Sequence, residues 1–298
     1  MKHLLLTLAA AACISQVQAQ IVETSTPKPL LKGVEREMYY PILSEDGTRL
    51  LFSNVDFSGL RMYDYNDNVT VTISEEARAG FDAVFTPDGR AVYFVAQQNV
   101  DGLNMRQVKQ YNVATGNVVA VTPQGRMVAR PAATNSNVAT MVDGKIVSRL
   151  NNKDVSVRID GSTLFITRNG VEKAYSPVES YAGYLWASVS PDKTKVLFFA
   201  AGKGAFVIDL QGNVIAELGN YESPVWYGND LVVAMNADDN GYQYCSSQII
   251  IMRADGSEMQ ELTRPESMAM NPTASFSAGK IVYNTIDGRL YEMNVTIK

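Results

Sequence analysis

One short pattern, a tight turn followed by an apolar segment, recurs along the chain and constrains the fold more than any other feature. It reads FTPDGRAVYFVA at residues 85–96, LSEDGTRLLFSN at residues 43–54 and VSPDKTKVLFFA at residues 189–200. Proline presets φ, aspartate hydrogen-bonds the nearby backbone and glycine adopts positive φ freely, so each central cluster predicts a turn. The β-branched and aromatic residues that follow are typical of a strand buried on both faces.

Short strand-like segments fill the rest of the chain, separated by Gly, Asn, Asp and Pro, without a long apolar run at helical spacing. Aligned on the turn, they form six units of about 45 residues, each with about four strands. The third unit, from RPAATNSNVATMV to STLFITRNGVEKAYS, is the most degenerate. Radial repetition of four-stranded sheets lets a long β chain avoid exposed edges. We therefore predict an all-β, six-bladed β-propeller of four-stranded antiparallel blades.

The two ends of the sequence complement each other. The sixth unit lacks an outer strand, and the segment IVETSTPKPLLKG at residues 21–33 has no unit of its own. An unpaired strand edge invites association with other chains. We therefore predict that the N-terminal segment supplies the outer strand of the last blade and closes the ring.

Residues 1–19 have the pattern of a cleaved secretory signal peptide. Lys2 precedes the apolar run at residues 4–14, and Val17 and Ala19 occupy the −3 and −1 positions of a cleavage site. Residues 20–298 then form a single propeller domain of a periplasmic or secreted protein. Cys13 permits a lipoprotein reading, although its preceding residues depart from a lipobox. No later segment has the length and apolarity of a membrane span.

The single histidine, His3, lies within the predicted signal peptide. An exported chain without histidine has no Ser-His-Asp triad and no histidine-ligated zinc. The formal net charge is −5 at pH 7 and no run of Lys or Arg occurs, which argues against a nucleic-acid partner. Cys245, the one cysteine after residue 19, lies in a strand-like segment and is expected to be a buried core thiol.

The chain contains no nucleophile elbow of the form G-x-S-x-G. Residues 236–241, NADDNG, match the opening of a calcium loop, but Ser247 stands where such a loop needs a bidentate acid. The simpler reading is a long hairpin between two strands. We expect no cofactor, with calcium as the one alternative left open.

The turn-strand segments TPDGRAVYFVA, SEDGTRLLFSN and SPDKTKVLFFA are followed by Y-N-V-A-T-G, Y-D-Y and I-D-L-Q-G. Together they resemble the PD40 (WD40-like) repeats of TolB-type β-propellers, and the resemblance extends over residues 21–298. It implies a six-bladed propeller in the bacterial cell envelope. The N-terminal α/β domain of TolB has no counterpart in this sequence.

These observations favour a non-enzymatic binding propeller, expected to be a monomer that recognises an envelope protein, a peptide or a glycan at the mouth of its channel. Two alternatives stay open. One is a histidine-free carbohydrate-active enzyme, lyase-like and using Tyr and Arg; the other is a scaffold that serves only assembly.

Six equivalent residues, one directly before the first strand of each unit, are the candidate binding site. They are Tyr40, Asp82, Arg130, Trp186, Ser223 and Asn271. Four of them precede a proline, which fixes the path of the chain into the strand. Aromatic residues supply contact area and charges supply orientation, so this mixture suits recognition, with Trp186, Tyr40 and Arg130 as its core. The alternative is that the six side chains merely fill or solvate the channel.

Overall fold

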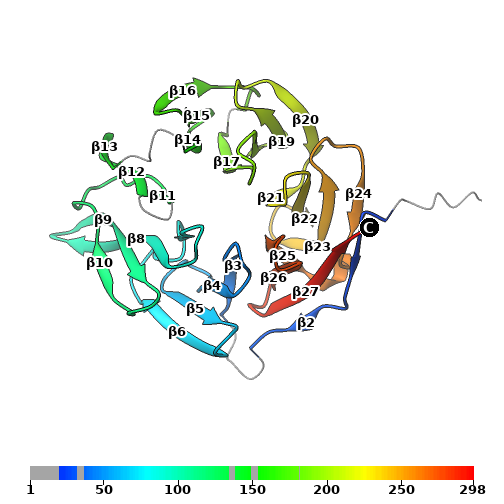
Figure 1. Cartoon of the computed structure of the whole chain (residues 1–298), viewed down its shortest axis with the longest axis horizontal. Helices are drawn as coiled ribbons and strands as arrows, with labels where there is room; N and C mark the ends of the chain where they lie inside the picture. Colours follow the sequence, from blue (N-terminus) through cyan, green and yellow to red (C-terminus); the bar gives the residue numbers. More distant parts are fainter. Residues whose placement is uncertain (1–19, 32–36, 134–137, 149–153, 181) are drawn as a thin grey trace, which may run out of the picture.

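The computed structural model describes residues 20–31, 37–133, 138–148, 154–180 and 182–298. Within these ranges the strands form seven antiparallel sheets, arranged as the blades of a ring around a central opening (Figure 1). The predicted all-β propeller is therefore confirmed, and the predicted number of six blades is wrong.

The blades follow one another in chain order, and each is defined by its strands. Blade one holds β3 (Tyr39–Leu43), β4 (Arg49–Ser53), β5 (Leu60–Asp64) and β6 (Val69–Ser74). Blade two holds β7 (Val84–Phe85), β8 (Ala91–Val100), β9 (Leu103–Asn112) and β10 (Val118–Ala120). Blade three holds β11 (Ala132–Ala133), β12 (Val138–Val142) and β13 (Lys145–Ser148), and blade four holds β14 (Ser156–Asp160), β15 (Thr163–Arg168) and β16 (Val171–Tyr175).

The remaining three blades are longer. Blade five holds β17 (Tyr184–Val189), β18 (Lys195–Ala200), β19 (Gly204–Asp209) and β20 (Val214–Gly219). Blade six holds β21 (Glu222–Tyr227), β22 (Leu231–Asp239), β23 (Tyr244–Arg253) and β24 (Met259–Glu261). Blade seven holds β25 (Ala269–Ser275), β26 (Lys280–Thr285) and β27 (Leu290–Ile297), joined by β1 (Val22–Thr24) and β2 (Lys28–Pro29). A short 3-10 helix, η1, spans Pro265–Ser267, and the described residues include no helix long and apolar enough to cross a membrane.

The extra blade comes from the degenerate third unit, which the structure divides into blades three and four. Both are compact because short turns join their strands. The turns at residues 143–144 and 169–170 place both of their residues at positive φ, as two-residue hairpins require. Each of the two blades has three described strands. Together they occupy a stretch of chain that, by the period of the other units, was expected to form a single blade.

The repeated turn owes its geometry to one carboxylate. Ser44 Oγ donates a hydrogen bond to Asp46 Oδ1 at 2.6 Å, and the same oxygen accepts the Thr48 N–H at 3.0 Å. Equivalent hydroxyl-to-carboxylate bonds, at 2.7 Å and 2.6 Å, join Thr86 to Asp88 and Ser190 to Asp192. The motif that repeats in the sequence is therefore a hydroxyl, a spacer and an aspartate that together hold the turn before the second strand of the blade.

These turns make the stability depend on acid pH. The Thr86 hydroxyl and the Arg90 N–H hold the pKa of Asp88 below its ordinary value of 3.8. For Asp46 and Asp192 slight burial acts in the opposite direction, but similar donors outweigh it and lower the pKa. A lowered pKa in the folded state stabilises the fold above the unfolded-state pKa, and this contribution is lost as the pH falls through the folded-state value. We expect the free energy of unfolding, measured in urea, to fall below about pH 4.

The matched variant for this prediction replaces all three carboxylates. D46N/D88N/D192N is expected to show a flatter dependence of unfolding free energy on pH between about pH 5 and 3 than the parent chain. It should also be less stable at neutral pH, by about 1 kcal/mol for each weakened turn. An unchanged slope in the triple variant would assign the acid sensitivity to other carboxylates.

The N-terminal segment closes the ring, as predicted. β1 pairs antiparallel with β27, with Val22 opposite Ile297, and β2 pairs further along the same strand, with Lys28 opposite Glu292. In Figure 1 this segment runs along the outer side of β27. The chain ends are therefore joined by strand pairing within one blade.

Two further expectations concern residues 236–247. The long hairpin is confirmed, because β22 and β23 pair along their whole length and turn at residues 240–243. The expected burial of Cys245 is wrong: its thiol is exposed near the tip of this hairpin, beyond the part of β23 that packs in the core. The predicted signal peptide, with Cys13 and His3, lies outside the described residues.

Candidate binding site at the channel mouth

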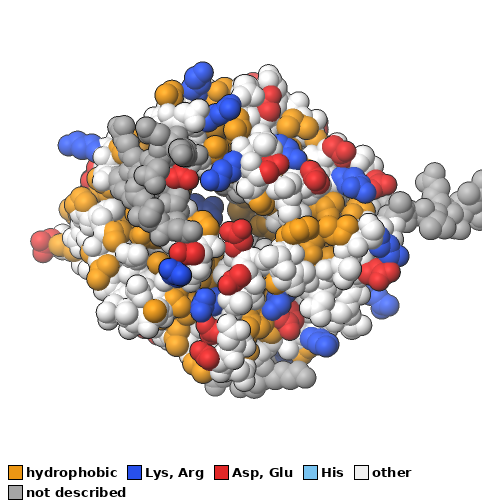
Figure 2. All heavy atoms as spheres, in the orientation of Figure 1, with side chains coloured by type: hydrophobic (Ala, Val, Ile, Leu, Met, Phe, Trp, Pro, Cys, Tyr) orange, Lys and Arg blue, Asp and Glu red, His pale blue; other side chains and the backbone are white. Residues whose placement is uncertain are grey.

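The loops that lead into the first strands meet the loops between second and third strands at one end of the ring, which we call the mouth. Gly59 N–H donates to Glu76 O at 3.0 Å and Gly80 N–H donates to Phe57 O at 3.1 Å, which joins the two loop types between blades one and two. Figure 2 shows the ring hollowed at its centre, with acidic and basic side chains around the opening. The mouth is therefore a composite surface built from several blades.

Four of the six candidate residues share a strained backbone. Each lies at a register shift in the first strand of its blade, where the strand bulges out of its ladder. Their φ angles are 55° at Tyr40, 51° at Trp186, 49° at Ser223 and 50° at Asn271. A left-handed conformation costs a residue with a side chain about 1–2 kcal/mol, asparagine least. The fold thus holds four different side chains in one unusual conformation at equivalent positions.

Hydrogen bonds link three of these residues across blades six, seven and one. Ser223 Oγ donates to Asn271 Oδ1 at 3.4 Å, and Asn271 Nδ2 donates to Asn284 Oδ1 at 3.1 Å. The same Asn284 oxygen accepts the Tyr40 N–H at 3.2 Å. Ser223 and Asn284 are buried, and they position Tyr40 and Asn271, which are both half-buried.

A row of rings continues from Tyr40 into blade two. Tyr40 stacks on Phe57 at 3.9 Å between centroids, and Phe57 meets Phe81 edge-to-face at 4.9 Å. The Arg78 guanidinium lies 4.2 Å from the centroid of Phe81. Phe81 is 48% exposed, a large fraction for an aromatic side chain. We call Tyr40, Phe57 and Phe81 the aromatic row, an apolar platform at the boundary of blades one and two.

The platform leads to a cluster of positive charge, which we call the arginine cluster: Arg78, Arg106 and Arg130. Asp82 lies among them, 7% exposed, and pairs with Arg78 at 3.0 Å. Burial raises the pKa of Asp82, and the charges of the three arginines oppose that rise. Burial and the charge of Arg78 lower the pKa of Arg106, whose Nε donates to Gln97 Oε1 at 3.0 Å. Arg130 is exposed.

The side of the mouth near blades six and one has the opposite character. Tyr244 donates its hydroxyl hydrogen bond to Glu222 at 3.2 Å. Burial raises the pKa of Tyr244 to about 12, and the charges of Glu222 and Asp239 add to the rise. Burial, Tyr39 and Asp56 likewise raise the pKa of Tyr40. A phenol with a raised pKa holds its proton more firmly, which is opposite to what a tyrosine base in a lyase requires.

Trp186 lies in blade five, apart from these two networks. Its ring meets Phe199 edge-to-face at 5.2 Å, and it is 38% exposed. The structure thus groups Ser223, Asn271 and Tyr40 through hydrogen bonds and places Asp82 beside Arg130. Blade four contributes none of the six residues, because its existence was not predicted.

Four residues of the mouth are not among those predicted from the repeat: Arg78, Arg106, Phe57 and Phe81. The segment RAGFD at residues 78–82 places two chemically useful side chains, Arg78 and Phe81, close to the predicted Asp82, and this local signal could have identified both. Arg106 and Phe57 come from loops and hairpins of other strands, so only the fold brings them to the mouth.

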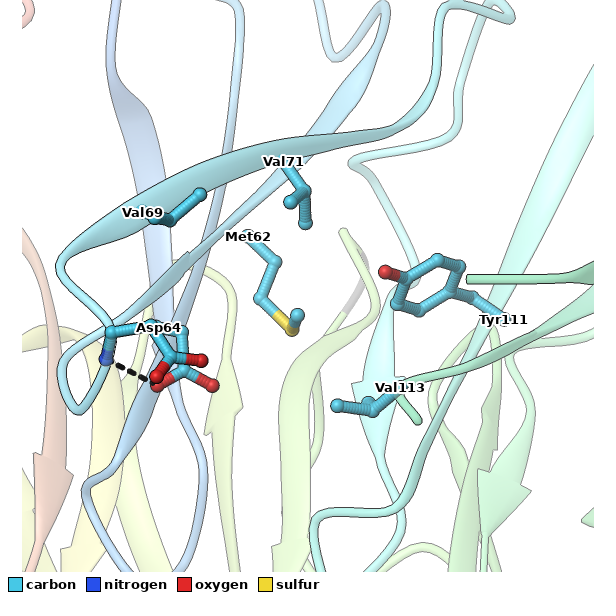
Figure 3. Close-up of a pocket in the computed structure, with 7 residues that line it drawn as sticks. Met62, Asp64, Val69, Val71, Tyr111 and Val113 are labelled. Atoms are coloured by element: carbon cyan, nitrogen blue, oxygen red, sulfur yellow. Dashed lines mark hydrogen bonds between the residues drawn. The ribbon is translucent and has the colours of Figure 1, made fainter. Parts of the chain in front are cut away.

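A second hollow lies between blades one and two, away from the mouth. Its volume is about 350 Å³, and its lining residues are Met62, Asp64, Asp67, Val69, Val71, Tyr111 and Val113. Figure 3 shows Met62, Val71 and Tyr111 facing one another across it, with Asp64 at one end. The Asp64 carboxylate already pairs with Arg49 at 2.9 Å and accepts the N–H groups of Asn66 and Asp67. The Asp64 carboxylate is therefore engaged in holding the β5–β6 turn.

Comparisons with solved structures support the architecture. TolB from Acinetobacter baumannii superposes with a TM-score of 0.51 at 15% identity, over 80% of this chain and 57% of that one. The β-propeller domain of Cps50 (Swd1) from Myceliophteria thermophila gives 0.61 at 9% identity, over 92% of this chain and 100% of that one. The WD40 β-propeller domain of Doa1 gives 0.59 at 12% identity, over 92% and 96%.

At these identities the likeness shows a shared propeller fold. The present chain spans little more than half of the TolB chain. No protein-family model matches the sequence, and no curated protein does.

Proposed function

We propose that the chain is an exported, non-enzymatic binding propeller that recognises a protein, a peptide or a glycan at its mouth. One observation carries the proposal: equivalent first-strand positions in four blades hold Tyr40, Trp186, Ser223 and Asn271 at positive φ. Backbone strain of this kind is typical of binding surfaces, and here it occurs where four different side chains surround one opening. A purely structural bulge is most easily built with glycine or asparagine at every position.

Two supports lie outside the mouth. TolB and the WD40 domains share the fold, and the TolB chain is a bacterial protein. The signal-like pattern of residues 1–19 motivates a periplasmic or secreted location. We further propose that the protein acts as a monomer, because the strands of its closing blade are paired within one chain.

The test is a pull-down from bacterial envelope extract, with bound proteins and glycans identified by mass spectrometry. Trp186→Ala is expected to weaken binding of the main partner by about 1–4 kcal/mol, because an exposed aromatic anchor loses its contact area. Phe276→Ala is the matched control: Phe276 is an exposed aromatic residue in the β25–β26 turn, at the opposite end of the first strand from the mouth. Equal recovery of every partner by the parent and Trp186→Ala would move the site to another face.

A further inference from the structure

We propose that the mouth selects acidic peptide segments, with an Asp or Glu carboxylate of the ligand bound by the arginine cluster and an adjacent apolar side chain on the aromatic row. This inference rests on the proposed binding function and names the class of ligand that the mouth recognises. It goes beyond a general binding surface because the mouth is electrically asymmetric.

The arginine cluster is unequal in charge. Three guanidinium groups, Arg78, Arg106 and Arg130, surround one carboxylate, Asp82, so the cluster carries an excess of positive charge. Arg78 satisfies Asp82 directly at 3.0 Å. Among the described residues Arg130 has no hydrogen-bond or ion-pair partner, and Arg106 engages its Nε alone. Guanidinium forks bind carboxylates through two parallel hydrogen bonds, so a second carboxylate satisfies this excess.

The fold fixes the backbone positions of two of these arginines. Ala77, next to Arg78, forms an isolated bridge with Gln97 of β8. Gln97 pairs with Arg106 across the β8–β9 hairpin, and Arg106 forms a further bridge with Gly125. A continuous ladder therefore holds the backbones of Arg78 and Arg106 at set positions. Such preorganisation reduces the entropy that binding a ligand must overcome.

Acidic and basic residues lie on different blades of the mouth. Glu222 and Asp239 of blade six lie near Tyr244, whereas the arginine cluster lies on blades two and three. A ligand carboxylate is repelled there and attracted over blades two and three. The mouth thus orients an acidic ligand as well as holding it.

The apolar surroundings favour a peptide over an acidic glycan. Phe57 and Phe81 have no polar side-chain atoms, and the β8–β9 hairpin that carries Arg106 exposes Val100 and Leu103 at its tip. These groups match apolar side chains that flank an acidic residue and do not satisfy sugar hydroxyls. We therefore commit to a peptide and treat an acidic glycan as the competing outcome.

The experiment is an NMR titration of the chain, residues 20–298, with three synthetic peptides. The probe is Gly-Ser-Glu-Trp-Glu-Ser-Gly, and its matched forms carry Gln or Lys in place of both Glu residues. We expect the Glu peptide to bind about tenfold more tightly than the Gln peptide and to shift the Nε–Hε signals of Arg106 and Arg130. The R106Q/R130Q variant is expected to bind the Glu and Gln peptides equally. The control is Arg90→Gln, which removes one exposed charge in the β7–β8 turn at the other end of the blade and leaves the preference intact.

Other results overturn the inference. Equal binding of the Glu and Gln peptides by the parent chain, or absence of binding by the Glu peptide at millimolar concentration, removes the preference for acidic peptides. So does arginine-dependent binding of an oligogalacturonate in place of the peptide. Each of these leaves the proposed function standing as long as the envelope partner still depends on Trp186, so the two proposals fail separately.

Discussion

Deletion of residues 21–31 is expected to destabilise the protein by at least about 3–6 kcal/mol, because Ile21 and Val22 both lie in the core between blades six and seven. A loss of this size approaches the whole stability of an ordinary domain. The deletion also uncovers the edge of β27, which pairs with β1 and β2 in the intact chain. An exposed edge recruits other strands, so the shortened chain should self-associate.

A side-chain clamp provides the control for this deletion. Gln260 of β24 accepts the N–H groups of Ile21 at 2.8 Å and Val22 at 3.0 Å, and its own amide donates to Val22 O at 3.0 Å. Gln260→Leu removes these bonds and keeps every strand, so it should cost about 1–3 kcal/mol without promoting association. Thermal unfolding and size-exclusion chromatography with light scattering measure both effects. A deletion variant that melts and elutes like the parent chain would show that the seam does not stabilise the ring.

Phe198→Ala is expected to lower the free energy of unfolding by about 3–5 kcal/mol, the range for removing a large aromatic side chain from a closed core. Phe198 is 0% exposed and lies 4.8 Å from the ring of Tyr184 and 5.8 Å from that of Phe206, measured between centroids. Its second-strand position corresponds to Phe52 and Phe94 in blades one and two, which are buried as well. A phenylalanine at this position therefore supports several blades, and removing Phe198 leaves a cavity beside the preceding blade.

Urea denaturation provides the measurement, and Phe198→Leu is the graded comparison because it retains much of the apolar volume. We expect Phe198→Leu to lose less than half as much stability as Phe198→Ala. If the alanine variant loses less than about 1 kcal/mol, Phe198 does not hold the blade in the way proposed. So small a loss requires that the core collapses around the gap and fills it.

The blades predicted best from the sequence are those in which the residues of the turn repeat. The turn of residues 43–49 and its equivalents contain all of the atoms that hold them, so the pattern alone located the second strands. Residues 127–175 lack that turn, and compact hairpins at residues 143–144 and 169–170 allow two short blades where the period indicated one. The number of blades depends on how many sheets close a ring, which no local motif encodes.

The candidate site was predictable only in part, for a related reason. Equivalence within the repeat located Tyr40 and Trp186, yet neither residue type favours the left-handed conformation that the structure gives it. Tertiary pairing imposes that conformation against local preference. The burial of Asp82 and the approach of Arg106 also depend on contacts between blades, so the charge asymmetry of the mouth became visible only in the folded chain.

The seam in blade seven also sets the order in which the protein can fold. The bond between Ile21 N–H and Gln260 spans 239 positions of the chain, whereas the hairpins within each blade join neighbours. The N-terminal segment and its partner strand β27 lie at opposite ends of the chain, so the individual blades can form before these two segments meet. Closing so large a loop is entropically slow, and contacts of high sequence separation limit folding rates. Refolding should therefore proceed through an open arc of preformed blades, with docking of the N-terminal segment as its last and slowest step.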